Sequence, residues 1–227
     1  MTSAERGAVF DRLVALGHDV IHVPLIAIGP PADDGAALRG ALGRLGEFRW
    51  LVVTSTNGAR AVGAAALQHG RLRLAAVGAR TAQVLADVAG RPVDLVPEVE
   101  RAEGLLAAWP ADERGPALLA LADRAAPTLA DGLRSRGVTV EVVDAYRTTL
   151  RTPASDEIEA LAASDAVLLA SGSAAESLAA LPIAGGERRI VVIGPSTAAA
   201  AERLGLAVDA IAASPHTDDV VAALAAG

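Results

Sequence analysis

A unit made of a strand, a glycine turn, a helix and a second strand occurs twice in this chain, and this repeat constrains the fold more than any other feature. The later copy, residues 190–217, reads IVVIGPSTAAAAERLGLAVDAIAASPHT, and the earlier copy begins AAVGARTAQVLADVAGRPVD. Gly78 matches Gly194 and Thr81 matches Thr197, each pair 116 residues apart (194 − 78 and 197 − 81). The apolar runs predict short buried strands, and the glycines and hydroxyl residues predict turns into capped helices.

A third pair of residues keeps the same offset. Ser55, in VVTSTNGARAV, matches Ser171, in VLLASGSAAES (171 − 55 = 116). A further likeness joins GHDVIHV, which starts at Gly17, to GVTVEVV, which starts at Gly137. Because the period is far longer than that of a solenoid repeat, the pattern indicates an internal duplication that forms two related lobes.

Composition and charge exclude several classes of protein. The chain has 227 residues, 52% of them hydrophobic but only 2% aromatic, so we expect a sizeable core of Ala, Val and Leu. No apolar run reaches the roughly 18 residues of a membrane span, and residues 1–9 lack a signal-peptide pattern, so we expect a cytoplasmic protein without a membrane partner. There is no cysteine, and a formal charge of −7 argues against nucleic acid as a partner.

Strand and helix patterns alternate along the chain, which predicts parallel sheets covered by helices on both faces. The predicted strands are 19–23, 50–54, 74–77, 93–96, 117–121, 139–143, 166–169, 190–193 and 206–212. The predicted helices are 4–16, 35–45, 57–68, 81–88, 101–108, 128–136, 155–162, 173–181, 198–204 and 218–225.

The lobe boundaries follow from this order of elements. One helix and one strand before residue 24 are too little to fold alone, so we assign residues 1–23 to the block 150–227. A continuous lobe, residues 30–141, lies between, and the linkers 24–29 and 142–149 cross from one lobe to the other. We therefore predict an α/β protein with two related flavodoxin-like lobes, one of them discontinuous, joined by a two-stranded crossing that acts as a hinge.

Four loops rich in Gly, Ser, Thr or Asn follow strands and precede helices, at the carboxyl ends where open α/β sheets bind ligands. Any single loop of this kind is explained by helix capping, which Ser196 or Thr197 could provide. Four such loops, duplicated across two lobes, favour binding of phosphate or carboxylate by the free N–H groups of the helix starts. The candidate binding residues are Thr54, Ser55, Asn57, Gly58, Gly78, Thr81, Ser171, Gly172, Ser173, Gly194, Ser196 and Thr197.

The other motifs are weak indicators of function. The chain has neither GxGxxG nor a Walker pattern, its histidines His18, His22, His69 and His216 lack metal-ligand spacing, and Ser171 is not in a GxSxG elbow. We expect no metal. Tyr146 is the sole tyrosine, in DAYRT at the second crossing. On the residues alone, packing at the hinge is favoured over a phenol that donates a proton.

The ordered set TSTNGARA, AAVGARTAQVLADVAG…VDLVPE, VEVVDAYRT and VVIGPSTAAAAERLGLAVD…SPHT resembles the uroporphyrinogen-III synthases over nearly the whole chain. The resemblance implies a monomeric, cofactor-independent enzyme acting on hydroxymethylbilane, a linear tetrapyrrole with eight carboxylates. The family eliminates the terminal hydroxyl, closes the ring and inverts ring D through a spiro intermediate. The resemblance also implies a catalytic role for Tyr146 and places the turn threonines of the family at Thr81 and Thr197.

The residue chemistry is compatible with this activity. Loss of hydroxide needs a proton donor, which Tyr146 can be, and helix-start N–H groups hold carboxylates without a basic surface. Arg60, Arg80 and Arg147 lie near the loops in sequence and could add charge-assisted bonds. The alternative is a non-catalytic two-lobed protein that binds an anionic small molecule. Family members begin with a strand ahead of the first helix, and without it we expect a gap in the discontinuous lobe.

Overall fold

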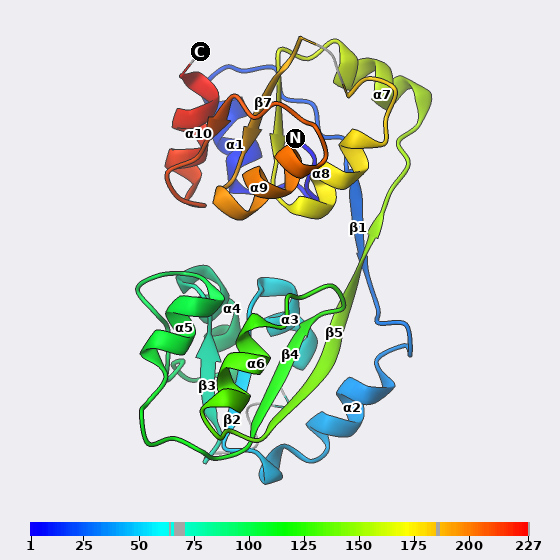
Figure 1. Ribbon diagram of the computed structural model, residues 1–227. Coiled ribbons are helices and arrows are strands. Elements are labelled where there is room, and N and C mark those ends of the chain that lie inside the picture. The colour runs from blue at the N-terminus through cyan, green and yellow to red at the C-terminus, as the bar shows by residue number, and fades with distance from the viewer. Residues whose placement is uncertain (64, 66–70, 185–186, 227) are drawn as a thin grey trace. The chain divides into compact units, whose positions relative to one another are not determined.

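A computed structural model describes residues 1–63, 65, 71–184 and 187–226 (Figure 1). The chain divides into two compact units. The first, Met1–Ile28 with Thr148–Gly227, is called the discontinuous unit here, and Gly29–Arg147 is called the middle unit. The chain therefore passes between the units twice.

The middle unit is built on a five-stranded sheet with the strand order β1-β5-β4-β2-β3. The middle unit contributes β2 (Trp50–Val53), β3 (Arg73–Ala76), β4 (Ala117–Ala122) and most of β5 (Val140–Leu150) to this sheet, whereas residues 26–28 of β1 (Ile26–Gly29) and residues 148–150 of β5 belong to the discontinuous unit. Its helices are α2 (Ala36–Leu42), the 3-10 turn Leu45–Glu47, α3 (Thr56–Val62), α4 (Ala79–Ala89), α5 (Ala102–Ala108) and α6 (Thr128–Ser135). Strand β2 pairs in parallel with β3 and with β4, and β4 pairs in parallel with β5, as the alternating pattern predicts.

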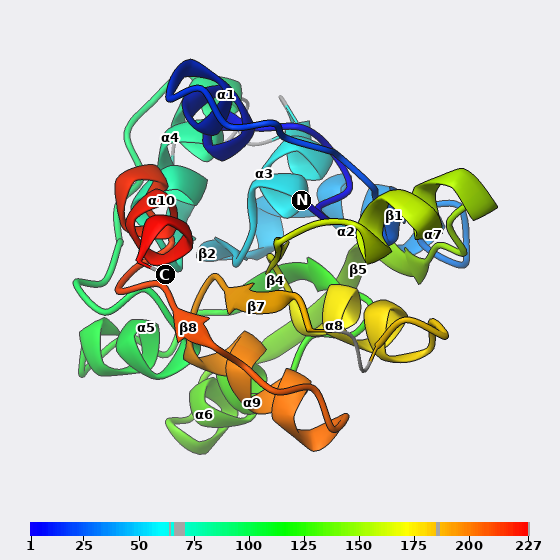
Figure 2. The same ribbon diagram turned by 90° about the horizontal axis from the view of Figure 1, so that it is seen from above.

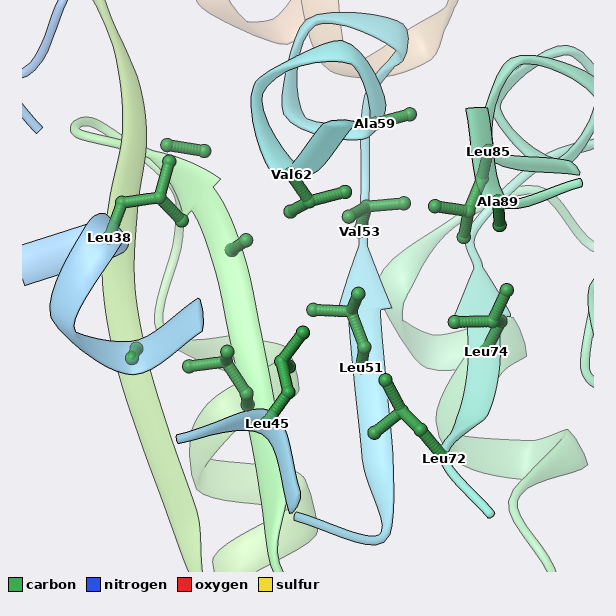
Figure 3. Close-up of a cluster of buried hydrophobic side chains, with 14 of the residues drawn as sticks. Leu38, Leu45, Leu51, Val53, Ala59, Val62, Leu72, Leu74, Leu85 and Ala89 are labelled. Carbon is green, nitrogen blue, oxygen red and sulfur yellow. The ribbon is translucent and has the colours of Figure 1, made fainter. Parts of the chain in front are cut away.

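Side chains that alternate along β2 enter two different cores, one on each face of the sheet. Leu51 and Val53 pack with side chains from α2, α3 and α4, among them Leu38, Val62 and Leu85 (Figure 3). On the opposite face, Trp50 and Val52 pack with side chains of α5 and α6. Both faces of the sheet are therefore covered by helices, which explains why β2 is buried at all four positions.

The discontinuous unit has a smaller parallel sheet with the order β6-β7-β8. Its strands are β6 (Ala166–Leu169), β7 (Arg189–Val192) and β8 (Ala210–Ile211). Its helices are α1 (Ala8–Ala15), α7 (Ser155–Ala162), α8 (Gly172–Ala179), α9 (Pro195–Arg203) and α10 (Thr217–Ala225). Helices α8 and α9 lie next to each other (Figure 2) and cover one face, where Leu169 and Val192 are buried. Leu168 and Val191 enter the other core, with Val220 of α10.

The same hydrogen bond occurs once within each unit, which supports the internal duplication. The Asp94 Oδ2 atom accepts from the Leu74 N–H at 2.7 Å, and the Asp209 Oδ2 atom accepts from the Ile190 N–H at 2.7 Å. Leu74 lies in β3, and Ile190 lies in β7, its counterpart in the repeat. The same carboxylate thus satisfies the same backbone donor in both copies.

Two predicted strands are much shorter than the apolar runs indicate. Of residues 93–96, only Leu95 forms a bridge, to Ala75, and of residues 206–212 only Ala210–Ile211 is a strand. Helix α3 also ends earlier than predicted, because Gly63 turns the chain at φ 53°. The rest of the predicted helix 57–68 includes residues 64 and 66–68, which lie outside the described residues.

The predicted strand 19–23 is wrong, and the first strand is β1, which begins at Ile26. Residues 21–25 are held by the first residues of the chain. The Met1 ammonium donates to the Ile21 carbonyl at 2.7 Å, and the Val23 and Leu25 N–H groups donate to the carbonyls of Met1 and Thr2. These few bonds do not make a strand ladder.

A cavity of about 440 Å³ lies within the discontinuous unit. The residues that line it include 18–21 and 163–168, and the latter range contains most of β6. The buried Thr2 hydroxyl donates to the Leu168 carbonyl at 2.7 Å.

Across the part of the chain that the structure describes, no helix has both the length and the apolar character to cross a membrane.

The two segments that connect the units pair with each other, as the crossing was expected to do. Strands β1 and β5 are hydrogen-bonded neighbours (Figure 1). Just past the end of β5, the Arg151 N–H donates to the Leu25 carbonyl at 2.9 Å, and the Thr149 hydroxyl donates to the Ala27 carbonyl at 3.4 Å. Since the residue number rises on one strand as it falls on the other, the ladder is antiparallel.

Candidate functional site

Two serines of the predicted loops cap helices. The Ser55 hydroxyl accepts from the Gly58 N–H at 3.0 Å at the start of α3, and the Ser171 hydroxyl accepts from the Ala174 N–H at 3.2 Å at the start of α8. Both serines have extended backbones, as N-cap residues do. Each hydroxyl satisfies one of the four free N–H groups of its helix.

The two turn threonines are not caps, which corrects the capping expected at Thr197 and at its match. Helices α4 and α9 begin at Ala79 and Pro195, with Gly78 and Gly194 in the N-cap position. Thr81 and Thr197 lie inside the first turn and are 8% and 4% exposed. The helices begin two or three residues earlier than predicted, so these hydroxyls cannot reach the free N–H groups as a cap does. Ser196 is not a cap either and lies exposed in the first turn of α9.

The start of α4 carries a carboxylate from the chain itself. The Glu100 Oε1 atom accepts from the Ala79 N–H at 2.8 Å. Gly78 leaves room for it, because a Cβ atom there would lie 2.5 Å from the Glu100 Oε2 atom. Glu100 lies 21 residues from Ala79 and in no motif, so no signal in the sequence predicts this contact. An incoming anion at this loop has to displace Glu100 or use the later N–H groups.

The glycines of the other loops have different surroundings. A Cβ on Gly58 would lie 3.1 Å from the Ala120 carbonyl oxygen, so glycine allows α3 to approach β4. A Cβ on Gly172 would lie 3.1 Å from the Ala200 Cβ, so glycine allows α8 to approach α9. Gly194 has nothing within 4 Å of such a position. Glycine at position 194 is therefore not required by a close neighbour in its unit, whereas the start of α4 is occupied by Glu100.

The loops of each unit lie at the carboxyl ends of adjacent strands. In the middle unit, Thr54–Gly58 follows β2 and Gly78–Thr81 follows its neighbour β3. In the discontinuous unit, Ala170–Ser173 follows β6 and Gly194–Thr197 follows its neighbour β7. Thr54, Asn57 and Ser173 are half-buried. Each unit thus brings two predicted loops together at one edge of its sheet.

Tyr146 lies on β5 in the middle unit, where the register of the sheet changes. Leu121 pairs with Asp144, but the next residue of β4, Ala122, pairs with Tyr146. The Asp123 N–H then donates to the Tyr146 carbonyl at 3.1 Å. Bulges of this kind re-aim side chains and are common beside active sites. The half-buried Tyr146 ring packs against the core that contains Val143.

The described residues contain no group of three or more His, Asp or Glu side chains that could hold a metal ion, and His69 lies outside the described residues. The Arg60 guanidinium donates to the Asn57 side-chain oxygen at 3.4 Å, within the α3 loop. Arg80 and Arg147 are exposed.

Comparisons with known proteins agree on one family. A family model described as uroporphyrinogen-III synthase HemD matches residues 9–222. A search of curated proteins found no match. Among solved structures, a mutant uroporphyrinogen III synthase of the extremely thermophilic bacterium Thermus thermophilus is similar, with 22% identity, 96% of this chain and 93% of that chain covered, and a TM-score of 0.64.

A uroporphyrinogen-III synthetase of Helicobacter pylori is similar as well, with 18% identity, 92% of this chain and 95% of that chain covered, and a TM-score of 0.61. At these identities the structural likeness shows a shared fold. The match of the family model extends over almost the whole sequence. The chain therefore belongs to the uroporphyrinogen-III synthase family.

Proposed function

We propose that this chain converts hydroxymethylbilane into uroporphyrinogen III, with loss of water and inversion of ring D, and that Tyr146 supplies the proton. The family match over residues 9–222 carries the assignment of the reaction. Nothing in the described residues favours the alternative of a non-catalytic binding protein over it. The expected cytoplasmic location, monomeric state and independence of cofactors stay predictions.

In the proposed first step, the Tyr146 phenol gives its proton to the terminal hydroxyl of the substrate. The carbon–oxygen bond breaks, water leaves, and an azafulvenium cation remains. The cation then needs positioning more than further acid–base help, because ring closure depends on which carbon it meets. The register change at Ala122, which sets the position of Tyr146 on β5, supports this role.

We further propose that the helix starts of α3, α4, α8 and α9 bind substrate carboxylates through backbone N–H groups. Ser55 and Ser171 occupy one donor at α3 and α8, which leaves the others for a ligand. The two proposed domains are residues 1–23 with 150–227 and residues 30–141. Each domain contributes two of these loops, and the division of the chain into two compact units supports this assignment.

The experiment is a product analysis. The purified protein is incubated with freshly made hydroxymethylbilane, the products are oxidised, and the isomers are separated. Spontaneous closure without inversion gives the type I isomer, whereas the proposed activity gives type III. Type I alone, from protein with the circular dichroism of a folded α/β chain, would overturn the proposal.

A further inference from the structure

Arg151 holds both crossing segments where they enter the discontinuous unit. Its backbone N–H donates to the Leu25 carbonyl at 2.9 Å, and its Nη1 atom donates to the Pro24 carbonyl at 2.9 Å. A single residue just past the second crossing thus binds two consecutive residues of the first. Arg151 stands in no sequence motif that predicts this role.

The same residue is tied to two helices of the discontinuous unit. Its Nη2 atom lies 2.9 Å from the Glu157 Oε2 atom, which also accepts from the Ala154 N–H at 2.8 Å at the start of α7. The hydroxyl of Ser177 on α8, a residue that is 4% exposed, donates to the Arg151 carbonyl at 3.0 Å. We call these residues, Pro24, Leu25, Arg151, Glu157 and Ser177, the Arg151 cluster.

Along both crossing segments, the side chains change abruptly from buried to exposed as the chain leaves the Arg151 cluster toward the middle unit. Val23 and Leu25 are 1% and 0% exposed, but residues 27, 28, 30, 147, 149 and 150 are all exposed. Deep burial returns at Pro31 on one segment and at Ala145 on the other. Backbone with few buried contacts opens at low free-energy cost, so bending is favoured between these limits.

We propose that Arg151 is a positioning residue, which anchors both crossing segments to the discontinuous unit and confines bending to residues 27–30 and 147–150. The inference rests on the proposed function, because Tyr146 directly precedes this stretch at its other end. Without the anchor, bending extends toward Pro24 and Pro153, and Tyr146 samples more positions. Misplacement of a catalytic group by about 1 Å can cost a large factor in rate.

The test uses Arg151→Ala in the full chain and measures distances between the units. The chain has no cysteine, so single cysteines at the exposed positions Asp87 on α4 and Arg203 on α9 accept spin labels cleanly. We expect pulsed electron paramagnetic resonance to show a broader distance distribution than in the labelled parent. The amide of residue 151 should exchange its hydrogen at least about tenfold faster, and kcat should fall about tenfold or more with KM changed less than about twofold.

Arg44→Ala is the matched control. Arg44 lies 2.9 Å from a Glu141 carboxylate oxygen, the same length as the ion pair of Arg151, and its guanidinium donates hydrogen bonds to Glu141 and Glu47 rather than to a backbone carbonyl of the first crossing. We expect a parent-like distribution and kcat for this variant. Arg151→Lys keeps the charge near Glu157 but loses the forked donor, so it should give intermediate values. It takes the place of Arg151→Ala if that variant does not fold.

An unchanged distance distribution and kcat in Arg151→Ala would overturn the proposal, as would equal broadening in Arg44→Ala. The distance and exchange measurements need no substrate. If the parent protein forms no uroporphyrinogen III, the proposed function fails, while these two measurements still decide whether Arg151 anchors the crossing.

Discussion

Ser55 and Ser171 make the same hydrogen bond at equivalent positions of the two copies. Each hydroxyl accepts from the N–H three residues further on, at 3.0 Å in one copy and 3.2 Å in the other. The offset of 116 residues between them (171 − 55) is the one that relates Gly78 to Gly194. The duplication therefore preserves local hydrogen bonding as well as the order of strands and helices.

Ser55→Ala and Ser171→Ala should each lower the free energy of unfolding by about 1 kcal/mol, because each removes an N-cap acceptor. Chemical denaturation measures the change. Ser55→Asp and Ser171→Asp are the controls, since aspartate caps a helix as well as serine does. Alanine variants as stable as the parent would show that these bonds do not hold the loops.

Thr81→Val and Thr197→Val should behave differently from the serine variants. Neither threonine hydroxyl forms a hydrogen bond within the described residues, and both side chains are buried in the first turn of a helix. Valine keeps the shape, so the free energy of unfolding should change by less than about 0.5 kcal/mol. If the hydroxyls contact substrate, as their place among the candidate binding residues predicts, KM should rise. Unchanged KM in both variants would remove them from the binding site.

Glu100→Ala should improve substrate binding if a substrate carboxylate occupies the start of α4. The variant frees the Ala79 N–H, which the Glu100 carboxylate otherwise holds at 2.8 Å. A carboxylate near a helix N-terminus is worth roughly 0.3–1 kcal/mol, so KM should fall about two- to fivefold. Glu98→Ala, at an exposed neighbouring position, controls for the loss of one negative charge. A KM equal to that of the parent or higher would exclude this helix start as a carboxylate site.

Glu157 should make stability depend on acid pH. The hydrogen bond from Arg151 is the main cause that lowers the pKa of Glu157 below its ordinary value of 4.5, with the Ala154 N–H next and the nearby His22 adding a smaller effect. A lowered folded pKa gives stability that is present above the ordinary value and is lost as pH falls through the folded pKa. The parent should therefore be more stable than Glu157→Gln at pH 7, and the difference should shrink below pH 4.5.

Urea denaturation of the parent and Glu157→Gln from about pH 7 down to about pH 3 measures this difference. When the same comparison is made in an Arg151→Ala background, the stability difference should lose most of its pH dependence. The substitution removes the hydrogen bond from Arg151, which is the main cause of the lowered pKa of Glu157. A stability difference that grows as the pH falls would contradict the assignment.

The sequence predicted the features that local patterns determine. Alternating apolar runs and glycine turns predicted parallel sheets with helices on both faces. The Ser, Thr and Asn residues of the loops predicted helix caps in general, which Ser55 and Ser171 provide. The same rule misplaced Thr81 and Thr197, because the helix patterns show the first turn only to within two or three residues. In the sequence, a threonine within the first turn of a helix looks the same as a threonine that caps it.

Contacts between distant residues could not be predicted in this way. Glu100 reaches Ala79 across 21 residues, and Arg151 reaches Pro24 across 127. Neither residue stands in a motif. The apolar runs 93–96 and 206–212 also predicted full strands, but a strand needs a partner along its length, and only Leu95 and Ala210–Ile211 have one.

The rate of type III product from Tyr146→Phe tests the central claim most directly. Phenylalanine keeps the ring that packs against the middle-unit core but removes the phenol proton. The type I isomer that forms spontaneously in the same tube serves as the internal reference. We predict that Tyr146→Phe, with an unchanged melting temperature, forms type III at least about 10²-fold more slowly than the parent, as for a lost general acid. A Tyr146→Phe protein that forms type III at the parent rate would contradict the account.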